Sequence, residues 1–105
     1  MIHTPPDNTN LDQIQGGEHV GSMAVRLFIE QHHPYVTLHG HIHETVDVSG
    51  EFKERIGDTI SLSSGNHNVG SKVAVLLLDT DHPANVRRLF LQDSLFSVLK
   101  RKIKK

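Results

Sequence analysis

The sequence predicts a mixed α/β (α+β) fold with one main helix and a mixed β-sheet. One segment, residues 20–32, has the apolar spacing of an amphipathic helix, and a series of short β-branched runs follows it. The chain has 105 residues with 36% hydrophobic content, enough for one small domain or part of a larger one. Because one helix cannot cover a sheet of several strands, we expect the chain to be the second half of a larger unit.

Composition excludes several classes of function and site. The formal net charge of −1 provides no overall basic field, which argues against nucleic acid as a partner. With no cysteine, disulfides and thiolate metal sites are excluded, and any metal ion must take histidine and oxygen ligands. Neither a signal peptide nor an apolar span long enough for a membrane is present, so we predict a cytoplasmic protein without membrane contact.

The first third of the chain predicts a strand end, a polar loop and the helix. Residues 1–6 resemble the end of a buried strand that runs into a proline turn, and residues 7–19 form a loop of turn residues. Ser22 is the expected N-cap of the helix, and Pro34 ends it. The expected buried stripe consists of Val20, Met23, Ala24, Leu27 and Phe28.

The rest of the chain predicts strands separated by turns of glycine, serine and asparagine. The expected strands are residues 35–38, 45–48, 52–56, 59–63, 72–80 and 86–91. The run 72–80 is apolar on both faces and is therefore expected to be central, with 86–91 beside it. Residues 93–105 form a strongly basic tail, which we expect to be a solvated chain end.

The segment His39-Gly40-His41-Ile42-His43-Glu44 carries the main chemical signal. It follows an apolar strand, and in an extended backbone His41 and His43 would face the same side. Imidazole is a common ligand of divalent metals, and Gly40 lets the backbone turn or approach what the histidines hold. The alternative is that these are surface histidines without a function, since the chain has nine histidines in all.

Several motifs together resemble the C-terminal half of the calcineurin-like metallophosphoesterases. In chain order they are His3-Thr4-Pro5-Pro6, Gly21-Ser22, Gly40-His41-Ile42-His43-Glu44 and Gly57-Asp58-Thr59. The resemblance covers residues 1–92, and it depends on the order and spacing of the motifs rather than on any one of them.

This resemblance implies a β-sandwich of two mixed sheets flanked by helices, with a dinuclear metal centre that hydrolyses phosphate esters. His3 and His41 would ligate one ion and His43 the other, and His41 and His43 would be catalytic through the bound metal. His39, Asn66 and His67 are candidates for positions near the site. The ions would be of the Mn, Fe, Zn or Ni class, and the substrate a phosphorylated small molecule, a nucleotide or a phosphodiester.

The sequence departs from the family in what it lacks. The family's Asp-x-His motif, bridging aspartate and Asn-His pair are absent in position, and Gly65-Asn66-His67-Asn68 comes too late in the order. Without a bridging carboxylate, the chain alone should hold metal weakly and be inactive. Three interpretations stay open: a fragment of a hydrolase, a non-catalytic metal-binding or oligomer-assembly module, and a degenerate domain without metal. We expect association with a second copy or with a missing N-terminal half.

Overall fold

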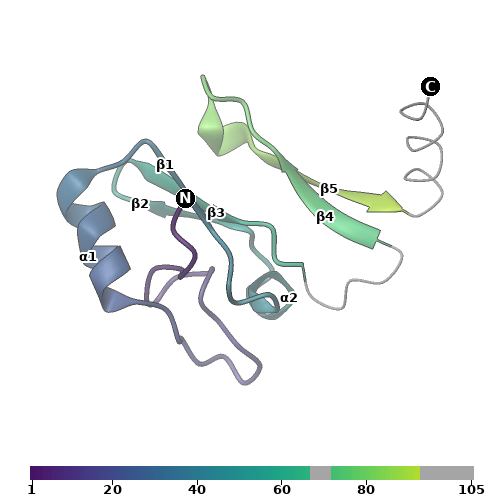
Figure 1. Ribbon diagram of the computed structural model, residues 1–105, viewed down its shortest axis with the longest axis horizontal. Coiled ribbons are helices and arrows are strands. Elements are labelled where there is room, and N and C mark those ends of the chain that lie inside the picture. Colours follow the sequence, from purple (N-terminus) through teal and green to yellow (C-terminus); the bar gives the residue numbers. More distant parts are fainter. Residues whose placement is uncertain (67–71, 93–105) are drawn as a thin grey trace.

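The computed structural model describes residues 1–66 and 72–92, which form a small mixed α+β structure with two sheets and few helices (Figure 1). This confirms the coarse fold class. The elements in order are α1 (Met23–His32), β1 (Val36–His39), α2 (Thr45–Ser49), β2 (Lys53–Ile56), β3 (Thr59–Ser63), β4 (Lys72–Leu77), a 3₁₀ turn η1 (Pro83–Asn85) and β5 (Arg87–Gln92). The predicted tail, residues 93–105, lies outside the described residues.

The larger sheet has three strands in the order β1-β3-β2. Strand β1 pairs with β3 in parallel, with Val36 opposite Ile60, and β2 pairs with β3 antiparallel, with Lys53 opposite Leu62. All five residues of β3 are buried. The predicted strands 52–56 and 59–63 are thus confirmed, and the strand predicted at 35–38 runs from Val36 to His39.

The smaller sheet is the antiparallel pair β4-β5, which lies against one face of the larger sheet (Figure 1). Ile60 and Leu62 are two positions apart in β3, so both side chains lie on that face, where they form the buried core with Val86. The partly buried side chains packed around them are Val36, Leu38, Phe52, Leu76, Leu78 and Ala84. The apolar core therefore lies between the two sheets.

The opposite face of the larger sheet is polar and is covered by the N-terminal segment. Thr37, His39 and Ser61 are buried on this face, and the hydroxyls of Thr37 and Ser61 bond each other across the strands. Glu54 on β2 accepts a hydrogen bond from the Asn10 backbone N–H, so the loop lies directly beneath the sheet. Ile2 N donates to Leu38 O, which aligns the first residues along β1.

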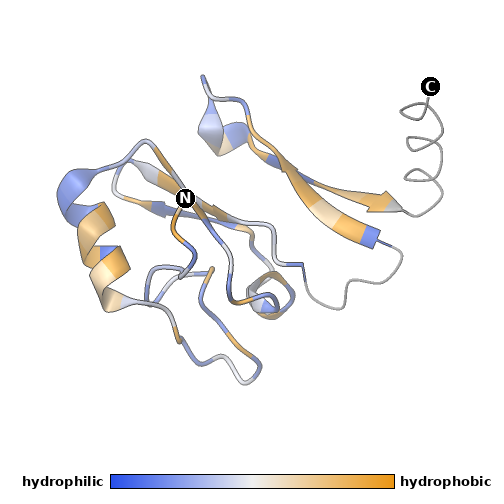
Figure 2. Cartoon of the chain, viewed as in Figure 1, coloured by the Kyte–Doolittle hydropathy of each residue, from blue (hydrophilic) through white to orange (hydrophobic). Residues whose placement is uncertain are grey.

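Helix α1 begins where the sequence predicts, but its apolar stripe is not buried. The Ser22 hydroxyl accepts a hydrogen bond from Val25 N, which confirms the N-cap, and His33 ends the helix in a left-handed conformation. The predicted stripe is wrong: Val20, Met23, Leu27 and Phe28 are 43–56% exposed, and Ala24 is exposed as well. Ile29 is the only residue of the helix that is buried, and Figure 2 shows the apolar residues on the helix.

Two strand predictions are also wrong. Residues 45–48 were expected to be a strand, but Thr45–Ser49 forms α2, a single short helix that Gly50 ends at φ 79°. Alternation over four residues is too short to distinguish a strand from one helical turn. In the helix the adjacent residues Thr45 and Val46 are both buried, whereas a strand would bury Val46 and Val48. Strand β4 is not central in the described part of the chain, because it pairs with β5 alone and exposes Lys72 and Leu77. The neighbouring strand predicted at 86–91 is confirmed as β5.

Candidate functional site

The histidine segment lies at the end of β1, where the chain leaves the sheet and turns. His41 has φ 65°, a left-handed conformation that a residue other than glycine adopts at an energetic cost. Ile42 N bonds Gly40 O at 2.7 Å, and the Ile42 side chain is buried. The segment is therefore a turn and not the extended strand end on which the same-side geometry of His41 and His43 depended; both side chains are exposed.

The structure brings His3 and His41 together although they are separated by 38 positions. His3 Nε2 lies 3.2 Å from His41 Nδ1, and the rings meet edge to face with their centroids 5.0 Å apart. The His3 ring rests against Gly40, where an added Cβ would lie 3.6 Å from His3 Nδ1. Gly40 N donates to His3 O, so the segment before the prolines is bonded to the strand end.

The facing nitrogens of His3 and His41 suit one divalent ion. Two nitrogen ligands at about 2.0–2.1 Å from a tetrahedral ion lie about 3.3–3.4 Å apart. The 3.2 Å between His3 Nε2 and His41 Nδ1 is close to that separation. Without an ion, one of the two nitrogens must carry a proton for the pair to attract rather than repel. Metal binding and this hydrogen bond are therefore alternatives at the same place.

His43 is not part of this pair. It is exposed, and among residues 1–66 and 72–92 no group of three His, Cys, Asp or Glu side chains is close enough to share an ion. Its neighbour Glu44 accepts a hydrogen bond from Gln15 N, so the loop packs against the segment beside His43. Two of the three predicted ligands thus meet, and the third lies on the same turn without joining them.

His39 is buried on the polar face of the sheet and is fully engaged by protein partners. Its Nδ1 lies 3.0 Å from Ile2 O and 3.1 Å from Thr4 O, and its Nε2 lies 2.8 Å from Thr37 Oγ1. Burial lowers the pKa of His39, because desolvation of the charged ring outweighs the two carbonyl acceptors that favour it. With both nitrogens occupied, His39 contacts the chain on either side of His3 but is not free to ligate an ion.

The other near-site candidates lie on the loop after β3. The Asn66 side chain makes two hydrogen bonds with the backbone of Ala74. Its Nδ2 donates to Ala74 O at 2.9 Å, and its Oδ1 accepts from Ala74 N at 2.7 Å, which joins the loop to β4. Gly65 has φ 61°, and a Cβ there would meet Val46 Cγ2 at 2.1 Å, so glycine is required beside α2. His67 lies outside the described residues.

Sequence analysis missed Asp12, whose carboxylate organises the polar loop. Asp12 is fully buried and accepts hydrogen bonds from the backbone N–H groups of Asn8, Thr9 and Gly21. His19 Nδ1 donates to Asp12 Oδ1 at 2.6 Å, with the His19 side chain 31% exposed. Nothing local marks Asp12, because it is one of several turn-forming residues between positions 7 and 17.

Burial by itself would raise the pKa of Asp12. The hydrogen bonds from His19 and from the three backbone amides outweigh that effect, so the pKa of Asp12 is lowered. Close packing explains the glycine of the Gly21-Ser22 motif. A Cβ on Gly21 would lie 2.7 Å from Pro5 O and Pro6 O and 2.8 Å from Asp12 Cβ. Glycine at this position therefore lets the proline turn, the loop and the start of α1 meet.

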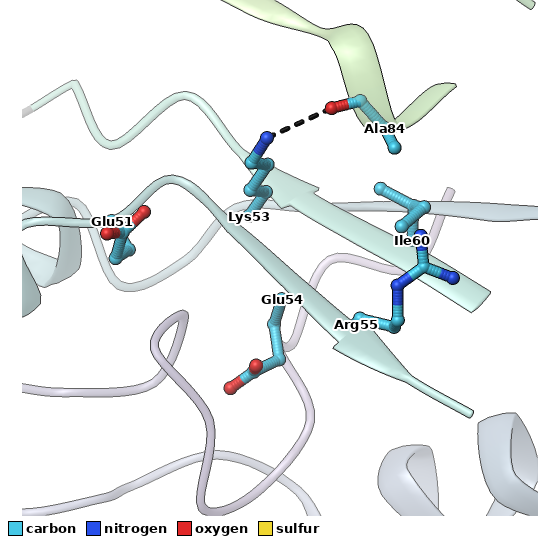
Figure 3. A pocket seen from close by; sticks show the side chains of 6 residues that line it. All are labelled: Glu51, Lys53, Glu54, Arg55, Ile60 and Ala84. Carbon is cyan, nitrogen blue, oxygen red and sulfur yellow. Dashed lines mark hydrogen bonds between the residues drawn. The ribbon is translucent and has the colours of Figure 1, made fainter. Parts of the chain in front are cut away.

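A separate pocket of about 210 Å³ lies at the β2 edge of the larger sheet, on the far side from β1 (Figure 3). Figure 3 shows Lys53 and Glu54 pointing to opposite sides of β2, and Lys53 Nζ donates to Ala84 O at 2.9 Å. Arg55 and Ile60 lie opposite each other on the paired strands. The pocket is lined by none of the predicted metal ligands.

Within residues 1–66 and 72–92, no helix is long and apolar enough to cross a membrane. Comparison of the chain with protein-family models, with curated proteins and with solved structures gives no match in any of the three.

Proposed function

We propose that this chain is the C-terminal half of a calcineurin-like metallophosphoesterase domain and supplies the histidine side of a dinuclear centre that hydrolyses phosphate esters. The observation that carries the proposal is the contact between His3 Nε2 and His41 Nδ1 at 3.2 Å. The His-x-Pro-Pro and Gly-His-x-His motifs, which suggested the family, are separated by more than thirty residues in the sequence, and their histidines meet in space.

In this proposal His3 and His41 would hold one ion, and His43 would hold the second. The ions would supply positive charge that offsets the charge developing on a phosphoryl group. The chain's own residues hold the imidazoles: Gly40 leaves room for the His3 ring, and His41 follows it in a left-handed conformation with its Nδ1 3.2 Å from His3 Nε2. Substrates of this centre would be phosphorylated small molecules, nucleotides or phosphodiesters.

The centre needs carboxylates that this chain does not bring to the histidines. Neutral imidazoles cannot offset the charge of two dications, so a second polypeptide segment must contribute acidic ligands. We propose that an N-terminal half or a second copy of the chain supplies them. The chain alone should then bind metal weakly, at one ion rather than two.

Metal binding by the purified chain tests the proposal directly. We expect calorimetric titration with Zn²⁺ or Mn²⁺ to show one weak site that His3→Ala and His41→Ala each weaken at least about tenfold. His82→Ala is the matched control, since His82 is an exposed histidine on the turn before η1. No binding at millimolar metal, or binding that is unaffected by either substitution, would contradict the proposal.

Hydrolysis of a chromogenic phosphodiester in the presence of Mn²⁺ then shows whether the centre is completed. Turnover that is lost in the His41→Ala, His43→Ala double variant would mean that copies of this chain complete the centre together. Metal binding without turnover would place the reaction in a longer assembly that includes the missing carboxylates.

A non-catalytic metal-binding or assembly module is the second candidate. It is favoured by the grouping of only two candidate ligands in the described part of the chain, which fits a mononuclear site. The two proposals differ in stoichiometry. Addition of the carboxylate-bearing partner should create a second metal site for the hydrolase and none for the module.

A further inference from the structure

We propose that His39 is a positioning residue that holds His3 beside His41, by clamping the backbone carbonyls on both sides of His3. This inference rests on the proposed function, because it concerns the histidine pair that would bind the ion. His39 Nδ1 lies within hydrogen-bond distance of Ile2 O, at 3.0 Å, and Thr4 O, at 3.1 Å. Carbonyl oxygens only accept, so Nδ1 carries the proton and donates to both.

The other side of the ring fixes this protonation. His39 Nε2 lies 2.8 Å from Thr37 Oγ1 and must accept, because its proton is on Nδ1. The Thr37 hydroxyl therefore donates to Nε2 and accepts from the Ser61 hydroxyl. A continuous series of hydrogen bonds thus connects the central strand β3, through β1 and His39, to the segment that carries His3.

The clamp complements the backbone bonds of that segment. Ile2 N donates to Leu38 O and Gly40 N donates to His3 O, each at 2.9 Å, which holds residues 2–3 to the edge of β1. The His39 ring adds bonds from the sheet face, to the carbonyls of Ile2 and Thr4, and so holds the backbone on both sides of His3.

Burial gives the clamp its rigidity. His39 is 7% exposed, whereas His3 and His41 are both exposed and have no surrounding core to hold their rings. An exposed pair stays at 3.2 Å only if the backbones that carry it are fixed. The turn at Gly40-His41 fixes the backbone of His41. The backbone bonds to β1 and the His39 clamp together fix the backbone of His3.

The test uses two substitutions that differ in one donor. In His39→Asn the amide nitrogen is bonded to Cγ, as Nδ1 is, so a donor toward Ile2 O and Thr4 O is retained. In His39→Gln the nitrogen is one bond farther out, so that donor is lost while a polar group of similar size remains. The two readouts are the nuclear Overhauser effect between the ring protons of His3 and His41 in metal-free protein, and the affinity for Zn²⁺.

We expect His39→Gln to lose the ring-to-ring Overhauser effect and to bind Zn²⁺ about ten- to a hundredfold more weakly. His39→Asn should keep the Overhauser effect and stay within about threefold of the original affinity. A merely structural role would lower stability in both variants without separating them by these readouts. An unchanged Overhauser effect in folded His39→Gln, or an Asn variant that behaves as the Gln variant does, overturns the inference.

A second pair keeps the test decisive if His39→Gln does not fold. Thr37→Val removes the hydroxyl that fixes the ring, and Thr37→Ser retains it, so only the valine variant should lose the Overhauser effect. Equal Overhauser effects in these two variants would also overturn the inference. Failure of the proposed function gives a different result, in which the original protein shows the ring contact but does not bind Zn²⁺.

Discussion

At the scale of single residues, the buried carboxylate of Asp12 connects separate parts of the polar loop and the start of α1. Its oxygens accept from three backbone amides and from His19 Nδ1, with the shortest of these bonds at 2.6 Å. The acceptor is needed as a carboxylate, because a protonated acid would replace one acceptor by a donor that faces N–H groups. This explains why the pKa of Asp12 is lowered although burial acts in the opposite direction.

The lowered pKa predicts how stability depends on pH. A carboxyl group with a lower pKa in the folded state stabilises the fold fully above its unfolded pKa, and this contribution is lost as the pH falls through the folded pKa. We expect Asp12→Asn to lower the free energy of unfolding by about 1–3 kcal/mol at pH 7. The difference from the original protein should shrink below about pH 4.

Urea denaturation at pH 7, 5 and 3 measures this difference. Asp58→Asn is the control, since Asp58 is exposed in the turn between β2 and β3, and it should change the unfolding midpoint little at any of these pH values. A deficit in Asp12→Asn that is the same at pH 3 as at pH 7 would rule out a role for the ionised carboxylate.

At the scale of elements, α1 shows how a helix can form without burying its apolar stripe. The Ser22 cap and the stop at Pro34 define its ends, and Ile29 contacts the interior, while Met23, Leu27 and Phe28 stay exposed. Spacing indicates which side of a helix is apolar, but not whether this chain supplies the element that covers that side. The exposed face agrees with our proposal that the chain associates with a further segment.

Alanine substitutions on the two sides of α1 should have unequal effects. Ile29→Ala removes a side chain with 0% exposure and should cost about 2–4 kcal/mol of unfolding free energy. Leu27→Ala removes a side chain that is 45% exposed and should cost about 1 kcal/mol or less. Thermal or urea unfolding followed by circular dichroism compares them, and equal losses would show that Leu27 is buried in solution, for example in a dimer.

At the scale of the whole molecule, β3 joins the two layers. It pairs with β1 and β2 on its two edges, and its alternate side chains reach the apolar core on one face and the polar network on the other. Within the described residues, β4 and β5 pair only with each other, so each has a strand neighbour on one edge. The side chains of Leu77, Leu89 and Phe90 on these strands are 39–55% exposed. Local unfolding should therefore begin in the smaller sheet.

Amide hydrogen exchange tests this order of stability. We expect the amides of β3, such as Leu62, to exchange at least about tenfold more slowly than those of β5, such as Leu89, because the β3 amides open only when both layers separate. Exchange of the purified chain in D₂O, followed by NMR, provides the rates. Faster exchange in β3 than in β5 would mean that the smaller sheet, and not β3, is the stable centre.

Features that depend on neighbouring residues could be predicted from the amino-acid sequence. Ser22 and Pro34 set the ends of α1, and turn residues located the strands: Gly50 and Gly57 mark the turns beside β2 and β3, and Pro83 the turn before β5. The order of the His-x-Pro-Pro and Gly-His-x-His motifs also identified His3 and His41 as candidates before their contact was known. Capping, turn formation and strand propensity act over a few residues, so a local pattern contains them.

Features that depend on residues distant in the sequence became visible in the folded chain. The folded chain has a helix at residues 45–49, in which the Thr45 hydroxyl donates to Asn10 O across the loop, and it has β4 at an edge of its sheet. The tertiary structure also assigned His39 to the clamp and Asp12 to the loop, roles that no spacing predicts. Burial and hydrogen-bond partners are properties of the whole packed chain, which is why the geometry of the histidine pair appeared only in the structure.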